Sequence, residues 1–162
     1  MAVTVTIRGT PIPFPTSGES PNWAEAVTEF AQAVEDALIT LGLGIGDITP
    51  QIYNIDAFNG NVIPQDVQNL AFSNTLVRSS VIRYAVTRTS STETAIEAGL
   101  ILIAYNPSLS VGNKWYITTQ KVGDGKISFS ITDAGQIQFT TTALGGINYS
   151  GEISFAAVSL LQ

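Results

Sequence analysis

The most constraining stretch of the chain is residues 126–142, KISFSITDAGQIQFTTT. Apolar residues alternate with polar ones over 127–131 and again over 136–140. A period of two places alternate side chains on opposite faces of a strand. Asp133-Ala134-Gly135 lies between the two segments, and these residue types favour a three-residue hairpin turn with Gly in the left-handed conformation. Each strand has one apolar face that must be covered, so the stretch predicts an antiparallel sandwich.

Five further segments are typical of sandwich strands, because they recur at regular spacing between turn residues. The segments are 72–76, 81–89, 98–105, 115–122 and 151–161. The fold class that we expect is mainly β, an antiparallel jelly-roll sandwich over residues 69–162. Residues 1–68 would form an extended arm, a helix and an irregular attachment segment.

The arm and the helix are read from the first 41 residues. Residues 3–7 alternate as a strand, and Pro11, Pro13 and Pro15 predict a polyproline-like strap over 10–16. The strap lies either on a partner or on its own domain. Ser20-Pro21 is typical of a helix start, and apolar residues spaced by three and four predict a helix over 22–41.

Two strands are apolar on both faces, which indicates association between copies. Residues 100–104 are continuously apolar and 153–161 nearly so, whereas antiparallel strands usually keep one wet face. The helix would cover one of these strands, and a second copy would cover the other around a symmetry axis. We therefore expect a homo-oligomer whose interface residues are Leu100, Leu102, Phe155, Val158 and Leu160.

Composition excludes several classes of function. The net charge is −6 and no Lys/Arg cluster occurs, so we expect no nucleic-acid partner. No apolar run reaches the roughly 18 residues of a membrane span, and no secretion signal is recognisable at the start. Charged residues make up 12% of the chain, fewer than the usual quarter or so, which suits surface hidden in an assembly.

Little catalytic chemistry is indicated. The chain has no His and no Cys, which removes His- and Cys-based triads and imidazole metal sites. A two-carboxylate glycosidase stays open in principle, but the acids Glu93, Glu97, Asp124, Asp133 and Glu152 fall at expected turns or strand ends. We expect no enzyme activity and no cofactor. Oxygen-rich side chains over 54–61 leave a calcium site open, although they lack the closing carboxylate of a known loop.

A family resemblance rests on four features of residues 81–162. They are the aromatic-rich strand 81–89, the apolar strand 100–105, the DAGQIQFTT hairpin, and Tyr149-Ser150-Gly151 before an apolar last strand. In these features the chain resembles compact jelly rolls of the tumour-necrosis-factor and complement-C1q type. Behind an arm and a helix, it is similar to small virion proteins of tailed bacteriophages.

The resemblance implies a homotrimeric capsid decoration (cement) protein that binds the major capsid protein. Such a protein is made in the host cytoplasm and ends on the capsid exterior. Arg8, Pro11 and Phe14 of the arm would contact the capsid. The alternative is a receptor-binding fibre or knob module in which Trp115, Tyr116 and Tyr149 stack on a host surface glycan.

Overall fold

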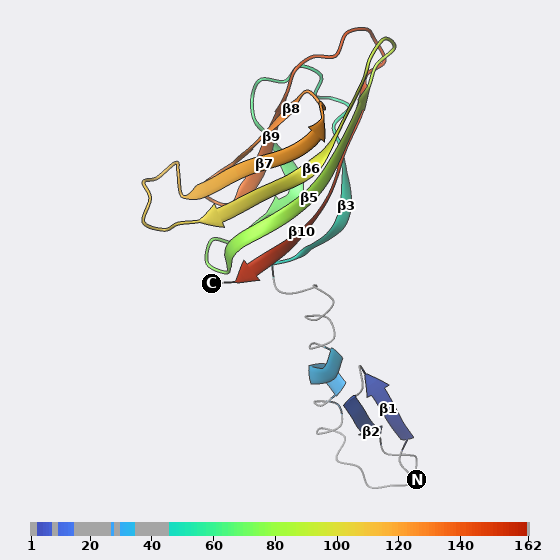
Figure 1. Ribbon diagram of the computed structural model, residues 1–162, viewed down its shortest axis with the longest axis vertical. Coiled ribbons are helices and arrows are strands. Elements are labelled where there is room, and N and C mark those ends of the chain that lie inside the picture. Colours follow the sequence, from blue (N-terminus) through green and yellow to red (C-terminus); the bar gives the residue numbers. More distant parts are fainter. Residues whose placement is uncertain (1–2, 8–9, 15–26, 28–29, 35–45, 162) are drawn as a thin grey trace. The chain divides into compact units, whose positions relative to one another are not determined.

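The computed structural model describes residues 3–7, 10–14, 27, 30–34 and 46–161 (Figure 1). The chain divides into two compact units, Met1–Gly44 and Ile45–Gln162. The boundary therefore lies earlier than the expected 68/69, because strands within 48–71 pair with the sandwich and not with the arm. The two units are described separately.

The N-terminal unit contains a two-stranded antiparallel sheet. Strand β1 (Val3–Ile7) is the expected strand and pairs with β2 (Thr10–Phe14). The expected polyproline-like strap is wrong over residues 10–14, since both prolines of β2 stand opposite threonines of β1. A two-stranded sheet consists of edge strands alone, where the missing N–H of proline is tolerated. Val27 and residues 30–34 are helical, and the rest of the predicted helix lies outside the described residues.

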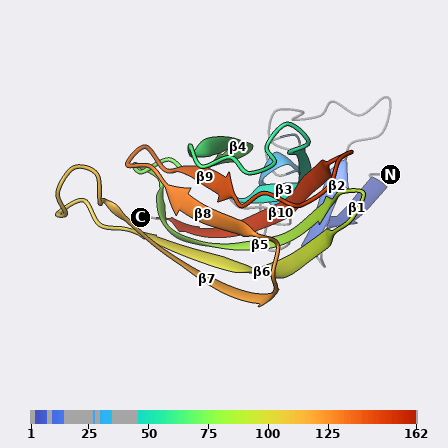
Figure 2. The same cartoon turned by 90° about the horizontal axis from the view of Figure 1, so that it is seen from above.

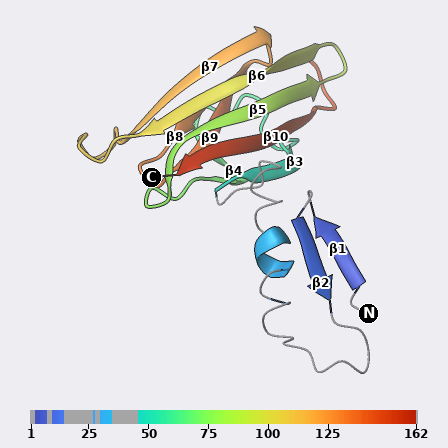
Figure 3. The same ribbon diagram turned by 60° about the horizontal axis from the view of Figure 1, so that its bottom comes forward.

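The second unit is an antiparallel sandwich, as the alternating sequence predicts. Its larger sheet has the strand order β3-β10-β5-β6-β7 (Figure 3). The bounds are β3 (Ile48–Asn54), β5 (Val77–Thr89), β6 (Thr94–Tyr105), β7 (Trp115–Gly123) and β10 (Ser150–Leu161). The smaller sheet has the order β4-β9-β8, with β4 (Gln65–Ala71), β8 (Ile127–Ile131) and β9 (Gln136–Thr141).

The smaller sheet covers one face of the larger one, so the unit has two layers (Figure 2). β3 is an edge strand of the larger sheet and pairs with β10. β4 is an edge strand of the smaller sheet and pairs with β9. The segment β3–β4 therefore runs beside β9–β10 and passes from one layer to the other. The consecutive strands β5, β6 and β7 form a simple meander in the larger sheet, with β7 at its edge.

Strand β5 shows how alternation builds the core. Along its second half, buried and exposed residues alternate strictly, and the buried set faces the smaller sheet. The same parity holds in β6, β9 and β10, so their inward side chains meet between the layers. The largest fully buried apolar side chains are Phe72, Phe139, Ile55, Leu70, Ile82, Ile101, Ile137, Ile153 and Val67.

The hairpin that defines the sequence forms as expected. Thr132 donates its N–H to the carbonyl of Gln136 at 3.0 Å, and Gly135 has φ 87°. A Cβ at Gly135 would lie 2.0 Å from the carbonyl oxygen of Phe72, so backbone packing as well as backbone conformation requires glycine there. The expected strand 72–76 is wrong: Phe72 is buried, but the residues after it form a turn.

Candidate functional site

A small cleft lies on the outward face of the smaller sheet. Its volume is about 180 Å³, and it is lined by Val62, Lys126, Ser128, Thr140, Thr141 and Thr142. Ser128 and Thr140 stand directly opposite each other on β8 and β9. Within the described part of the chain, the hydroxyls of Ser128, Thr140 and Thr142 have no hydrogen-bond partner. These hydroxyls can each donate and accept a hydrogen bond to a ligand.

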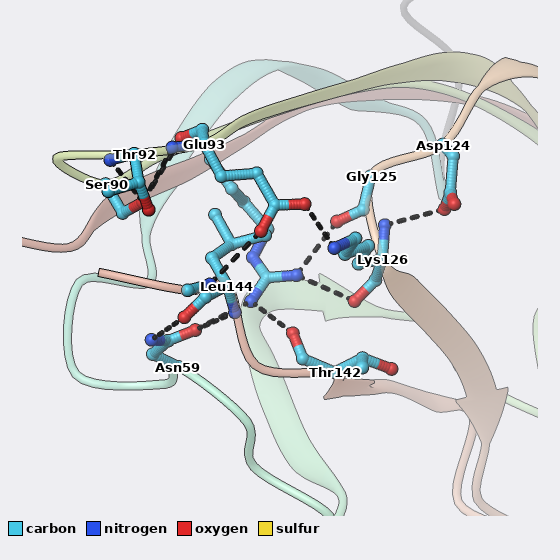
Figure 4. A network of polar contacts seen from close by, with 11 residues as sticks. Asn59, Ser90, Thr92, Glu93, Asp124, Gly125, Lys126, Thr142 and Leu144 are labelled. Atoms are coloured by element: carbon cyan, nitrogen blue, oxygen red, sulfur yellow. Dashed lines mark hydrogen bonds and ion pairs between the residues drawn. The ribbon is translucent and has the colours of Figure 1, made fainter. Parts of the chain in front are cut away.

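The buried guanidinium of Arg88 binds the backbone carbonyls of two residues that line the cleft, Lys126 and Thr142. Its Nη1 donates to the carbonyls of Gly125 at 2.9 Å and Lys126 at 2.7 Å. Its Nη2 donates to the carbonyl of Thr142 at 2.9 Å and to Oδ1 of Asn59 at 3.4 Å. Figure 4 shows these acceptors converging from three separate segments of the chain. Arg88 therefore fixes Lys126 and Thr142, two residues of the cleft, relative to each other.

All five N–H donors of Arg88 have an acceptor, because Nε donates to the hydroxyl of Tyr149 at 3.0 Å. The guanidinium carbon also lies 5.3 Å from the centre of the Tyr149 ring, within the range of a cation–π contact. Arg88 is 0% exposed. A buried charge is tolerated only when it is so fully hydrogen-bonded, which makes this residue a support of the site and leaves it no donor for a ligand.

Lys126 is the cleft residue with the most constrained backbone. It has φ 50°, in the left-handed region that residues other than glycine seldom adopt. Three contacts hold it there: its N–H donates to Oδ1 of Asp124 at 2.9 Å, its carbonyl accepts from Arg88, and its ammonium pairs with Glu93. Backbone strain of this kind is typical of functional sites, because surrounding contacts must maintain it.

Glu93 sets the charge beside the cleft. The pKa of its carboxyl is lowered, first by the hydrogen bond from Lys126 and then by the N–H of Gly145, which lies 3.1 Å away. Lys126 and Glu93 neutralise each other, so the cleft presents hydroxyls beside a paired ammonium and not a free cation.

Glu97 holds the loop between β7 and β8, which contains Gly125 and Lys126. It is buried, and its two oxygens accept from the hydroxyl of Tyr84 at 2.7 Å, the ammonium of Lys121 at 2.7 Å and the N–H of Gly125 at 2.9 Å. Burial, and then Glu97, raises the pKa of the Tyr84 hydroxyl, which stays protonated as a donor. The peptide of Gly125 is thus held between a buried anion and a buried cation.

The sequence analysis proposes that three aromatic residues, Trp115, Tyr116 and Tyr149, stack on a glycan, and the structure does not bring them together as one surface. Trp115 is 6% exposed and donates its indole N–H to the carbonyl of Asp133 at 3.3 Å. Tyr149 is half-buried and holds Arg88. Tyr116 is 57% exposed and so is accessible.

Four of the five predicted interface residues face outward on the larger sheet. Leu100 and Leu102 are half-buried on β6, while Val158 and Leu160 are exposed on β10. The prediction for Phe155 is wrong, because the alternation of β10 turns its side chain inward and buries it in the core of its own chain. Whether the outward residues contact another copy remains a prediction.

The predicted capsid-contact residues are largely undescribed. Arg8 lies outside the described residues, and Pro11 and Phe14 are described only as backbone of β2.

At the calcium site considered over residues 54–61, side-chain oxygens make hydrogen bonds within the protein. Asn54 and Asp56 hydrogen-bond to each other at 2.8 Å, and Asp56 accepts the N–H of Gly151 at 2.7 Å. Among the described residues no group of His, Cys, Asp and Glu suits a metal, and none of their helices is long and apolar enough to cross a membrane.

Sequence reasoning missed Arg88, the residue that organises the cleft. The signal was its parity: Ile82, Tyr84 and Val86 share one face of β5, and Arg88 is the next residue on that face. A charged side chain at an inward position needs buried partners. The partners here are mostly backbone carbonyls, which side-chain motifs do not reveal.

Comparison with solved structures finds tailspike proteins of phages. The tailspike of Acinetobacter phage vB_ApiP_P1 has a TM-score of 0.43 and 13% identity, with 70% of this chain and 22% of that chain covered. The tailspike of Acinetobacter baumannii phage AM24 has a TM-score of 0.40 and 9% identity, with 71% and 27% covered. No protein-family model and no curated protein matches the chain.

A third match bears on the expected absence of catalysis. The tailspike protein gp49 of Acinetobacter baumannii bacteriophage Fri1 has a TM-score of 0.35 and 13% identity, with 68% of this chain and 19% of that chain covered. That protein is described as a capsular polysaccharide depolymerase. The expectation that this chain is not an enzyme is contradicted by this finding and is withdrawn. The chain spans about a quarter or less of the tailspikes it resembles.

Proposed function

We propose that the chain is a structural module of a tailed-phage virion that binds a glycan of the host surface. The observation that supports this proposal is the hydroxyl-lined cleft on the smaller sheet, held rigid from below by Arg88. A binding site requires a preorganised cleft whose hydrogen-bond donors and acceptors are not paired within the protein. Ordering the side chains at the moment of binding would cost affinity.

The chemistry of the surrounding face suits a sugar. The outward residues of β8 and β9 are Ser128, Ser130, Gln136, Gln138 and Thr140, and none of them is charged. The one charged neighbour on β4, Asp66, accepts a hydrogen bond from the side chain of Gln138 at 2.8 Å. Hydroxyl and amide groups donate and accept hydrogen bonds, as sugar hydroxyls do. In this proposal the cleft replaces the aromatic residues predicted from the sequence. Two of those three residues make contacts within the protein, Tyr149 with Arg88 and Trp115 with Asp133.

The size of the cleft suits one ring of a longer chain. Its volume of about 180 Å³ is below the roughly 300–1,000 Å³ of ordinary small-molecule pockets. A single small subsite binds weakly, so useful adhesion requires several copies that engage a repeating polymer at once. The homotrimer expected from the sequence would supply such copies.

The decoration function is not carried forward, because no contact among the described residues favours a capsid partner, whereas the cleft favours a ligand. The side chains of its predicted contacts, Arg8, Pro11 and Phe14, are not described. Copy number in purified virions separates the two locations. A small number of copies per particle agrees with a tail module, and hundreds of copies at lattice sites would contradict it.

A binding assay on bacterial surface polysaccharides tests the proposal. Thr140→Val removes the hydroxyl and keeps the shape, and we expect the Kd for the bound glycan to rise about tenfold, which corresponds to about 1.4 kcal/mol. Thr119→Val on β7 is the matched control, since Thr119 is exposed, lies outside the cleft and pairs with the inward-facing Ile101. Equal affinity of the wild type and Thr140→Val for every bound glycan would contradict the proposal. Release of reducing ends in the same mixtures measures turnover.

A further inference from the structure

The outward face of the larger sheet carries a second surface. The two doubly apolar strands, β6 and β10, lie on either side of β5. Their registers align Val158, Val81 and Leu102 in one row across the three strands, and Ala156, Arg83 and Leu100 in the next. We call this surface the apolar face; its apolar members are Ile52, Val81, Ala85, Ile96, Ala98, Leu100, Leu102, Val122, Ala156, Val158 and Leu160.

The apolar face is large and open in the single chain. Val81 is 43% exposed and Val158 49% exposed, although both stand in the middle of the sheet. Five strands about 4.8 Å apart and five side-chain rows about 6.8 Å apart cover roughly 700 Å². This area includes the polar residues Ser79, Thr87, Thr118, Gln120 and Ser154, which share the face. It approaches the ~800 Å² that one partner contributes to a standard interface.

Two charges of opposite sign stand on the same face. Arg83 lies in the middle of it on β5, and Glu152 lies toward one end on β10. The registers place them four β10 residues apart, or about 13 Å along the strand, which is too far for an ion pair within one chain. Among the described residues neither has an ion-pair partner.

We infer that a second copy of this chain covers the apolar face, with Arg83 of each copy paired to Glu152 of another. A surface that carries both signs, separated from each other, complements a rotated copy of itself. A partner of one charge sign would leave either Arg83 or Glu152 unpaired in a dry interface, at a cost. The inference concerns assembly and holds whether or not the cleft binds a glycan.

Charge exchange in the full chain tests the inference. Sedimentation equilibrium of the wild type should give a mass above one subunit at micromolar concentration. Arg83→Glu and Glu152→Arg should each raise the dissociation constant of the assembly at least tenfold, because each places like charges together. The double variant should recover most of the wild-type association, since the pair is restored with its signs exchanged.

Two controls distinguish a change in assembly from a change in folding or in glycan binding. Both substituted residues are exposed, so the far-ultraviolet circular dichroism of all variants should match the wild type. Binding of a short, single-site oligosaccharide should be equal in every variant, whereas Thr140→Val should leave the mass unchanged. A wild type that remains monomeric would overturn the inference. Assembly without rescue in the double variant would overturn the Arg83–Glu152 pairing.

Discussion

The two outward faces of the sandwich differ although the same alternation builds both. The apolar face of the larger sheet is mostly Val, Leu, Ile and Ala, with a few Ser, Thr and Gln side chains and two isolated charges. On β8 and β9, the outward face of the smaller sheet is made of Ser, Thr and Gln around the cleft, and Asp66 of β4 lies beside Gln138. The inward residues of both sheets are uniformly apolar except at Arg88 and Glu97 and a few small polar residues.

The difference teaches where the information about function lies. Inward positions must be apolar to cover the core, so they specify the fold and little else. Outward positions are free of that demand, and the chain uses them differently on its two sheets. An apolar outward face requires a partner, whereas a hydroxyl-rich face remains soluble and can bind polar ligands.

Arg88→Met should have the largest effect, because it removes the support of the hydroxyl face. The carbonyls of Gly125, Lys126 and Thr142 would each lose a buried donor. Breaking a buried charged network typically costs about 3–5 kcal/mol. We expect the free energy of unfolding in urea to fall by about that amount, with loss of glycan binding. Arg83→Met on the apolar face is the control and should change the unfolding of the single chain by less than about 0.5 kcal/mol.

Leu102→Asp should abolish assembly while the sandwich still folds. Leu102 lies in the middle of the apolar face, where a contact between copies would bury an unpaired carboxylate at a cost of several kcal/mol. Sedimentation should show monomers, or aggregates if exposed apolar surface associates nonspecifically. Ser130→Asp makes the matched change on the outward face of the smaller sheet and should leave the mass unchanged. Equal masses for the wild type and Leu102→Asp would rule out this face as the interface.

Much of the sandwich was predictable because local alternation encodes it. The strands at 81–89, 98–105, 115–122 and 151–161 and the hairpin at Gly135 all form where the period of two indicates. A short strand near Ile52 is indicated by the sequence, although Pro50 interrupts its pattern. Its pairing with β10 was not predictable, since the two strands are about 100 residues apart. The cleft was missed for a related reason: its support comes from backbone carbonyls that folding alone brings to Arg88.

Glu97→Gln compares an inward carboxylate with an outward one. The charge of Glu97 accepts three hydrogen bonds, two of them from Lys121 and Gly125. An amide offers one acceptor oxygen and places an N–H₂ group against the remaining donors, so we expect a loss of about 1–3 kcal/mol in unfolding free energy. Glu152→Gln makes the same change on the apolar face and should have almost no effect on the unfolding of a single chain. Equal losses for both substitutions would show that burial of Glu97 contributes nothing.

Loss of the Glu93–Lys126 ion pair on acidification should give the smallest effect. The pKa of Glu93 is lowered in the folded chain, so its ion pair stabilises the fold above the ordinary Glu pKa and is lost as pH falls through the lower folded value. Between pH 5 and pH 2, Tm of the wild type should therefore fall slightly more than Tm of Glu93→Gln. The difference should be small and should shrink in 1 M salt, because the pair is partly exposed and screened. Mass in sedimentation is the contrasting measurement: if Glu93→Gln altered it, the two faces would be coupled and the separation of their roles would be wrong.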